Sequence, residues 1–103
     1  VGRANPYDVR ELIRTAMEGE FIKARDKLRE LMLKYGVSGG DLIKQIHSEI
    51  FQLEIPEKWK IRLASAIGET EFRLIQGGDD EIQLSALLAR LVEVGQIIGK
   101  DRE

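Results

Sequence analysis

Apolar residues recur with a helical period along the first half of the chain. In the first stretch they fall on every third or fourth position: Val9, Leu12, Ile13, Ala16 and Met17. This spacing places them on one face of a helix. Asn5 ahead of Pro6 is typical of a helix start and Gly19 of a helix end, so the pattern predicts a first amphipathic helix between them.

Two further one-sided helices are predicted over residues 20–35 and 38–53. The apolar face of the second helix comprises Phe21, Ala24, Leu28, Leu31, Met32 and Tyr35. Gly36 would end that helix, and Ser38 followed by Asp41 resembles a capping box that starts the third. The apolar face of the third comprises Leu42, Ile43, Ile46, Ile50 and Leu53. Because the link between the first two helices is short, we expect them to fold back as an antiparallel hairpin.

The second half of the chain predicts two helices that are apolar on two faces. One begins with Pro56 and is closed by Gly77, and the other runs from Asp79 to about Ile98. The faces of the fourth helix are Trp59, Leu63, Ala66, Ile67 and Leu74 on one side and Ile61, Ala64, Gly68, Phe72 and Ile75 on the other. The fifth has a main face of Leu84, Leu87, Leu88, Leu91, Val94 and Ile98 and a far face of Ile82, Ala86, Ala89 and Ile97. No useful segment alternates with a period of two, so the predicted fold class is all-α, a compact five-helix bundle of antiparallel helical hairpins.

A helix that is apolar on most of its circumference is either central in its own domain or half buried by a neighbour. Both interpretations stay open for the fourth and fifth helices. Two such helices beside three one-sided ones favour a subunit interface, which resembles a core cut in two. The interface hypothesis comprises Trp59, Ile61, Ala64, Gly68, Phe72, Ile75, Ile82, Ala86, Ala89 and Ile97. Trp59 would be either an anchor of that interface or a plug of the core.

Composition narrows the class of protein. The length of 103 residues suits one domain, residues 1–103, and 43% hydrophobic with 33% charged residues is typical of a globular protein. The absence of cysteine excludes disulfides and thiol catalysis, and a net charge of -2 disfavours a dedicated nucleic-acid binder. The pattern of apolar runs predicts neither a membrane span nor a signal peptide, so we expect a soluble intracellular protein. Because Val1 is not a methionine, we expect a fragment or processed product.

Candidate chemistry is sparse. His47 lies off the main face of its helix, near Phe51, and is expected to be partly buried and structural. The acids at 79–81 lack the spacing of a calcium loop and suit the positive end of a helix dipole. The glycines at 36, 39 and 40 lack the lysine and strand of a phosphate loop, and the third helix has too few base-reading side chains for a helix-turn-helix. We therefore predict no catalytic, cofactor-binding or metal-binding residue.

Four stretches of the chain together resemble a known family. They are GEFIKARDKL from Gly19, GVSGGDLIKQIHSEI from Gly36, IGETEFRLIQG from Ile67 and EIQLSALLARL from Glu81. In this order they are similar to the small subunits of replication factor C, the clamp loader of archaea and eukaryotes, with archaeal members closest. The resemblance implies the C-terminal domain of a longer AAA+ subunit, a five-helix collar through which five subunits assemble into a ring.

The resemblance also implies partners and cofactors. Neighbouring small and large subunits would contact the collar, with the fourth and fifth helices supplying much of the contact. ATP and magnesium would bind the missing N-terminal region, which would also engage the sliding clamp and primer-template DNA. The phosphate loop, magnesium motif, arginine finger and sensors are missing here, so no catalysis is carried over, and little direct DNA contact is expected. The implied location is the cytoplasm in archaea, or the nucleus in a eukaryote.

Two other classes of function are open to the sequence. A free-standing helical adaptor would dock a partner's helix in a groove beside Phe72 and Ile75. An acid/base enzyme is disfavoured because no set of polar residues converges on an apolar floor. An upstream phosphate loop in the longer gene product would favour the collar, and its absence the adaptor.

Overall fold

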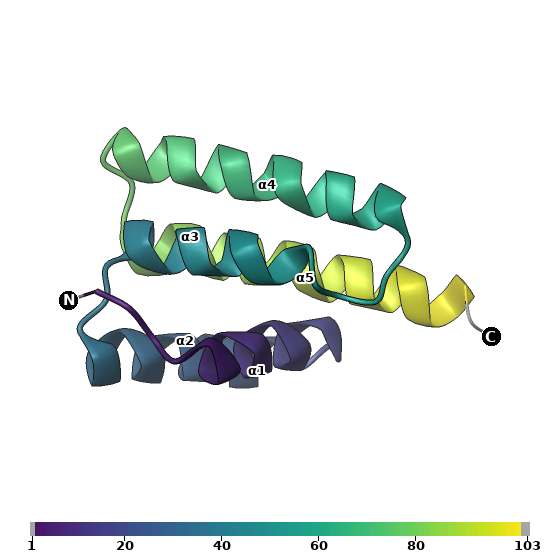
Figure 1. Cartoon of the computed structure of the whole chain (residues 1–103), viewed down its shortest axis with the longest axis horizontal. Helices are drawn as coiled ribbons and strands as arrows, with labels where there is room; N and C mark the ends of the chain where they lie inside the picture. The colour runs from purple at the N-terminus through teal and green to yellow at the C-terminus, as the bar shows by residue number, and fades with distance from the viewer. Residues whose placement is uncertain (1, 102–103) are drawn as a thin grey trace.

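The computed structural model describes residues 2–101 and contains helices whose ends follow local sequence signals (Figure 1). The helices are α1 (Pro6–Met17), α2 (Phe21–Tyr35), α3 (Gly39–Ile50), α4 (Glu57–Ile75) and α5 (Asp80–Asp101). Residues 2–101 form no strand, so the all-α prediction is confirmed.

Capping side chains start three of the helices. The Tyr7 amide donates to Asn5 Oδ1 at 2.9 Å at the start of α1. The Asp41 amide donates to Ser38 Oγ at 3.1 Å in α3, and the Ile82 amide donates to Asp79 Oδ1 at 3.0 Å in α5. Each bond satisfies an amide that has no partner within the helix, so these starts are set by local sequence.

Three predicted helix ends were wrong by a few residues. Pro56 precedes α4 with an extended ψ of 143° instead of forming its first turn. The α3 helix ends at Ile50 because residues 51–55 turn toward this proline, and a residue before proline is disfavoured in helical conformation. The α5 helix continues past Ile98 to Asp101. The positive charge of Lys100 in its last turn interacts favourably with the negative end of the helix dipole.

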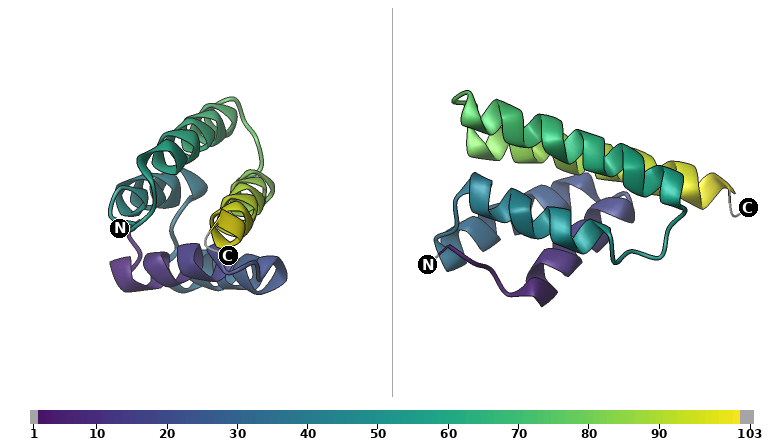
Figure 2. Two further views of the ribbon diagram at one scale, coloured as in Figure 1. Left: turned by 90° about the vertical axis from the view of Figure 1, so that its right-hand side faces the viewer. Right: turned by 45° about the horizontal axis from the view of Figure 1, so that its top comes forward.

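The helices lie in three tiers, with α4 at one side of the molecule, α3 and α5 in the middle, and the α1–α2 hairpin at the other side (Figures 1 and 2). The α5 helix contacts each of the other four, whereas α4 packs against α3 and α5. The α5 helix is therefore the central element, and α4 is peripheral with one side left uncovered.

The core uses the main apolar faces predicted from the pattern. The buried residues of α5 are Leu84, Leu87, Leu88, Leu91, Val94 and Ile98. Those of α4 are Trp59, Leu63, Ala66, Ile67 and Thr70, with the Thr70 hydroxyl donating to the Ala66 carbonyl at 2.9 Å. Burying one leucine or isoleucine contributes roughly 1.5 to 3 kcal/mol, so this orientation of α4 and α5 is strongly favoured.

The length and composition of α5 would also allow it to cross a membrane, contrary to the expectation drawn from the apolar runs. The central helix of a helical bundle passes the same test. In this fold the leucines of α5 pack against four other helices, which accounts for its apolar character.

Candidate subunit interface

Five residues of α4 form an apolar surface that faces away from the core. They are Ile61, Ala64, Gly68, Phe72 and Ile75, called here the α4 outer face. At 100° per residue they lie nearly opposite the buried side of the helix. The three large side chains Ile61, Phe72 and Ile75 are 63%, 62% and 74% exposed. The structure thus brings together five of the six α4 residues of the interface hypothesis, Trp59 being the exception, and decides which face of α4 is turned inward.

Gly68 lies at the middle of the α4 outer face, in the interior of the helix. A Cβ atom added there would meet no heavy atom within 4 Å. An interior glycine costs a helix up to about 1 kcal/mol relative to alanine. The packing of this chain therefore does not explain why a glycine stands at this position.

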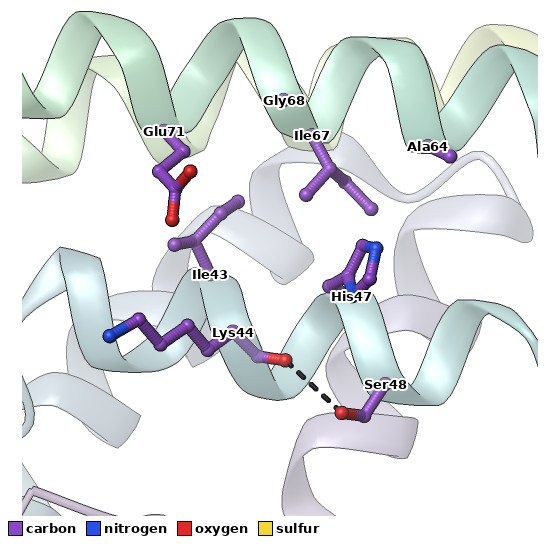
Figure 3. A pocket seen from close by; sticks show the side chains of 8 residues that line it. All are labelled: Ile43, Lys44, His47, Ser48, Ala64, Ile67, Gly68 and Glu71. Carbon is purple, nitrogen blue, oxygen red and sulfur yellow. Dashed lines mark hydrogen bonds between the residues drawn. The ribbon is translucent and has the colours of Figure 1, made fainter.

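A groove between α3 and α4 borders the outer face (Figure 3). Its volume is about 380 Å³, and its lining comprises Ile43, Lys44, His47, Ser48, Ala64, Ile67, Gly68 and Glu71. Ile43 and Ile67 point toward each other and are almost completely buried, so they form an apolar floor. Ala64 and Gly68 have so little side chain that the α4 wall is low. We call this feature the α3–α4 groove.

His47 in this groove is exposed, which corrects the prediction of a partly buried histidine. Its ring meets the edge of Phe51 with 4.9 Å between ring centroids. The register of α3 turns Ile46 and Ile50 inward, which leaves His47 on the outer side of the helix. Within residues 2–101 no group of three histidine, cysteine, aspartate or glutamate residues could hold a metal ion. The groove offers apolar contact with charged edges, and no acid/base pair is assembled in it.

The far face of α5 forms a separate surface. Ile82 and Ile97 are 65% and 42% exposed, Ala86 is exposed and Ala89 is half buried. A hollow between α4 and α5 is lined by the charged residues Arg62, Arg90 and Glu93 and by five apolar residues, among them Trp59 and Ile97 of the interface hypothesis. Ile97 of the α5 far face therefore shares this hollow with Trp59 of α4, whereas Ile61, Phe72 and Ile75 lie on the α4 outer face.

Trp59 is placed in the core of this chain, with 6% of its surface exposed. Lys58 Nζ and Arg62 Cζ lie 5.4 and 5.1 Å from the centre of its ring. These are cation–π contacts, in which a positive charge is attracted to the face of an aromatic ring. Of the two alternatives for Trp59, its position is that of a core residue. Little of the indole surface is left for a neighbouring subunit to contact.

Two exposed apolar residues on α2 were not among the predicted interface residues. Leu33 is 88% exposed and Ile22 is 61% exposed, and both lie opposite the buried stripe of α2. The signal was available in the sequence, because at 100° per residue neither position falls on that stripe. Arg29 lies on the same side of α2 and donates two hydrogen bonds of 2.9 Å to Glu81 of α5. These hydrogen bonds lower the pKa of Glu81 below its ordinary value.

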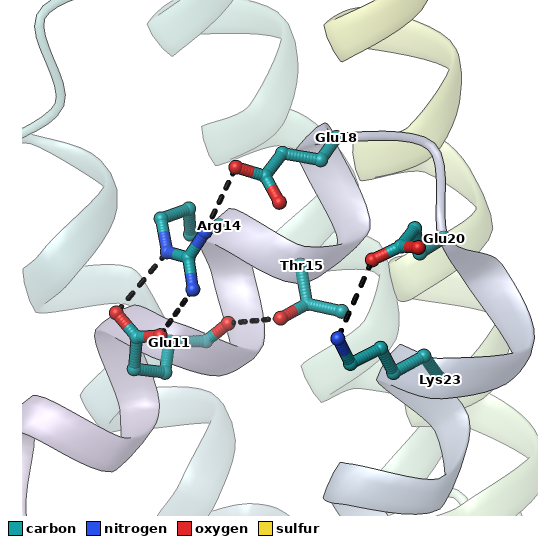
Figure 4. Close-up of polar contacts among 6 residues, drawn as sticks. All are labelled: Glu11, Arg14, Thr15, Glu18, Glu20 and Lys23. Carbon is teal, nitrogen blue, oxygen red and sulfur yellow. Dashed lines mark hydrogen bonds and ion pairs between the residues drawn. The ribbon is translucent and has the colours of Figure 1, made fainter.

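The surface at the end of α1 has a different character (Figure 4). Arg14 forms ion pairs with Glu11 and, at 2.8 Å, with Glu18, while Lys23 lies 3.6 Å from Glu20. The hydrogen bonds from Arg14 lower the pKa of Glu11. Charges that are paired at an exposed surface are already satisfied in the single chain, so this region does not call for a partner.

Comparison with known proteins gives consistent matches over most of the chain. The family model described as Replication factor C C-terminal domain matches residues 4–90. A replication factor C small subunit of Staphylothermus marinus is 53% identical over 98 residues, and one of Saccharolobus solfataricus is 54% identical over 97. These alignments cover 93% and 92% of this chain and 30% and 29% of the relatives. The small subunit of Thermococcus kodakarensis is 51% identical over 94 residues, which are 91% of this chain and 11% of that protein. The chain thus spans less than a third of the length of these relatives.

Proposed function

The chain belongs to the family of replication factor C C-terminal domains, and from this premise we propose that it is the assembly domain, or collar, of a clamp-loader small subunit. The observation that carries the proposal is the α4 outer face, where three large apolar side chains surround an unexplained glycine. Sequestering such side chains from water between subunits is a main source of association free energy.

The activity of the whole protein would come from the longer subunit. In relatives of this kind the remaining length would carry the ATPase modules that bind ATP and magnesium, and these would engage the sliding clamp and primed DNA. This domain would contribute no catalytic residue. It would contact neighbouring small and large subunits and keep the ATPase sites at subunit boundaries at a high effective concentration. The archaeal relatives favour an archaeal cytoplasm as the site of action.

The test introduces a charge into the α4 outer face of the full-length subunit. We expect Ile61→Glu and Phe72→Glu to abolish or strongly weaken subunit assembly in sedimentation velocity, with an unchanged helical circular dichroism spectrum. Tyr7→Glu is the matched control, because Tyr7 is equally exposed, at 61%, and lies on α1. Assembly of both α4 variants at the level of the parent would overturn the proposal.

The α3–α4 groove favours a second candidate, a helical adaptor that docks a partner helix beside Phe72 and Ile75. The same experiment separates the two functions. If the domain is an adaptor, the unsubstituted full-length subunit would remain monomeric at every concentration measured. If it is a collar, the same subunit would associate with itself without any other partner.

A further inference from the structure

We propose that residues 2–5 form a fixed strap along α3, and that this strap sets the direction in which the preceding part of the subunit leaves the domain. Gln45 of α3 is the positioning residue that holds the strap. The inference rests on one part of the proposed function, the placement of the ATPase modules ahead of this domain. Two observations support that placement: the matching family model is a C-terminal domain, and the chain covers less than a third of its relatives.

Three residues of α3, spaced four apart, hold successive positions of the N-terminal segment. The contacts pair Asp41 with Gly2, Gln45 with Ala4 and Glu49 with Arg10. Residues four apart lie on one face of a helix, so the segment follows this face of α3. Figure 1 shows it starting beside the first turn of α3 and running to the start of α1.

The middle contact is the most specific of the three. Ala4 is 2% exposed, and its amide and carbonyl both bind the side-chain amide of Gln45, at 2.8 and 2.9 Å. These hydrogen bonds are buried and join residues 41 positions apart in the chain. Because an unpaired backbone group is costly at a buried position, the two bonds fix Ala4 at one point on α3.

The contacts on either side of Ala4 keep the segment in register. A Cβ atom added to Gly2 would collide with the Asp41 carboxylate, so the backbone passes close to the first turn of α3 there. Arg10 Nε donates to Glu49 Oε1 at 2.7 Å and ties α1 to the last turn of α3. The path of the chain is therefore defined both before and after the Gln45 contact.

The strap is loosely packed apart from Ala4. A hollow of about 230 Å³ lies between the strap and α3, with Lys44 and Ser48 in its lining. Arg3 and Asn5, on either side of Ala4, are exposed. Because so few contacts bind the strap, a single substitution at Gln45 should release it while the helices stay folded.

A fixed strap limits the free movement of the preceding module. An extended chain spans at most about 3.3 to 3.6 Å per residue, so four released residues would let the module shift by up to about 14 Å. With the strap in place, the pivot between module and domain lies ahead of Gly2. Movement of the ATPase module is then transmitted to this domain instead of being absorbed by a slack linker.

Trypsin cleavage after Arg3 in the full-length subunit tests whether the strap is held, because exposed Arg3 directly precedes buried Ala4. We expect Gln45→Ala to release the fragment that begins at Ala4 at least about tenfold faster, as followed by mass spectrometry. Ile46→Val is the matched control, because Ile46 is the next residue of α3 and lies in the core, so its truncation weakens the fold without touching the strap. Equal rates in the parent and Gln45→Ala, or equal acceleration in Ile46→Val, would overturn the strap.

Electron–electron resonance distances in the same full-length subunit test the positioning role. One spin label is attached to an exposed cysteine of the preceding module and one to Asp26→Cys, at an exposed position of α2, in a background freed of other cysteines. We expect Gln45→Ala to broaden the distance distribution about twofold. Gln45→Glu should do the same, because a carboxylate keeps the size but has no donor for the Ala4 carbonyl.

The same control decides the outcome of the distance measurement. Ile46→Val should give the distribution of the parent. An unchanged width in Gln45→Ala, or equal broadening in Ile46→Val, would overturn the positioning role. Neither measurement requires subunits to associate, so a subunit that stays monomeric but shows these effects would overturn the assembly function and leave the strap intact.

Discussion

Gly95 of α5 lies directly against Met17 at the end of α1. A Cβ atom added to Gly95 would stand 2.7 Å from the carbonyl carbon of Met17, well inside van der Waals contact. No side chain larger than hydrogen fits between these two backbones, so the central helix and the first hairpin are held together at a point where backbone meets backbone.

Gly95→Ala is therefore expected to destabilise the domain by about 1 to 3 kcal/mol, because overpacking outweighs the better helix propensity of alanine. Urea unfolding followed by circular dichroism measures the change. Gly99→Ala is the control in the same helix, since a Cβ there meets nothing within 4 Å, and it should stabilise by up to about 1 kcal/mol. Equal effects of the two substitutions would contradict the close approach.

Gly68 allows stability to be separated from assembly. We expect Gly68→Ala to stabilise the monomeric domain by up to about 1 kcal/mol, because its Cβ would occupy open space in a helix interior. Gly68→Leu should leave the domain folded but reduce subunit association, since the new side chain would fill the groove. Thermal unfolding and sedimentation together check this pair, and a Gly68→Leu subunit that assembles normally would count against the groove as a contact.

Gln45 anchors the segment that precedes α1. Its Oε1 accepts from the Ala4 amide at 2.8 Å, and its Nε2 donates to the Ala4 carbonyl at 2.9 Å, at a buried position. Gln45→Ala leaves both backbone groups without these partners and is expected to cost about 1 to 3 kcal/mol. Hydrogen exchange should show faster exchange at Ala4 with little change in α5. Unchanged protection of Ala4 would show that other groups hold the segment.

The pair of Arg29 and Glu81 predicts a loss of stability in acid. Hydrogen bonds from Arg29 lower the pKa of Glu81 below its ordinary value of 4.5. A carboxyl whose pKa is lower in the folded state stabilises the fold above the unfolded pKa, and this contribution disappears as the pH falls through the folded value. The difference in urea midpoint between the parent and Glu81→Gln should thus shrink below pH 4.5. A difference that stays constant between pH 7 and pH 3 would show that the pair does not couple to folding.

Much of the local structure could be predicted because its causes lie within a few residues. Ser38 caps α3 and Asp79 caps α5 by hydrogen bonds to amides three residues ahead, and Gly36 ends α2 with a φ of 63°, which favours glycine. The outward position of Leu33 also follows from the helical period, although the sequence pattern was interpreted as a one-sided helix.

The orientation of the two-faced helices could not be predicted in the same way. In α4 the face with Leu63 and the face with Phe72 are both apolar, so the period alone does not say which is buried. Packing against α3 and α5 decides this, as it also decides that Trp59 lies in the core.

The sequence by itself determined the number and type of the elements, most of their ends and their one-sided or two-sided character, because capping bonds and helical periodicity act over one or two turns. The tertiary structure alone decided which apolar face of α4 stays exposed, that Gly68 borders a groove, and that Gly95 must be a glycine. These features depend on which helices come together in space, and contacts between residues distant in sequence carry no local signal.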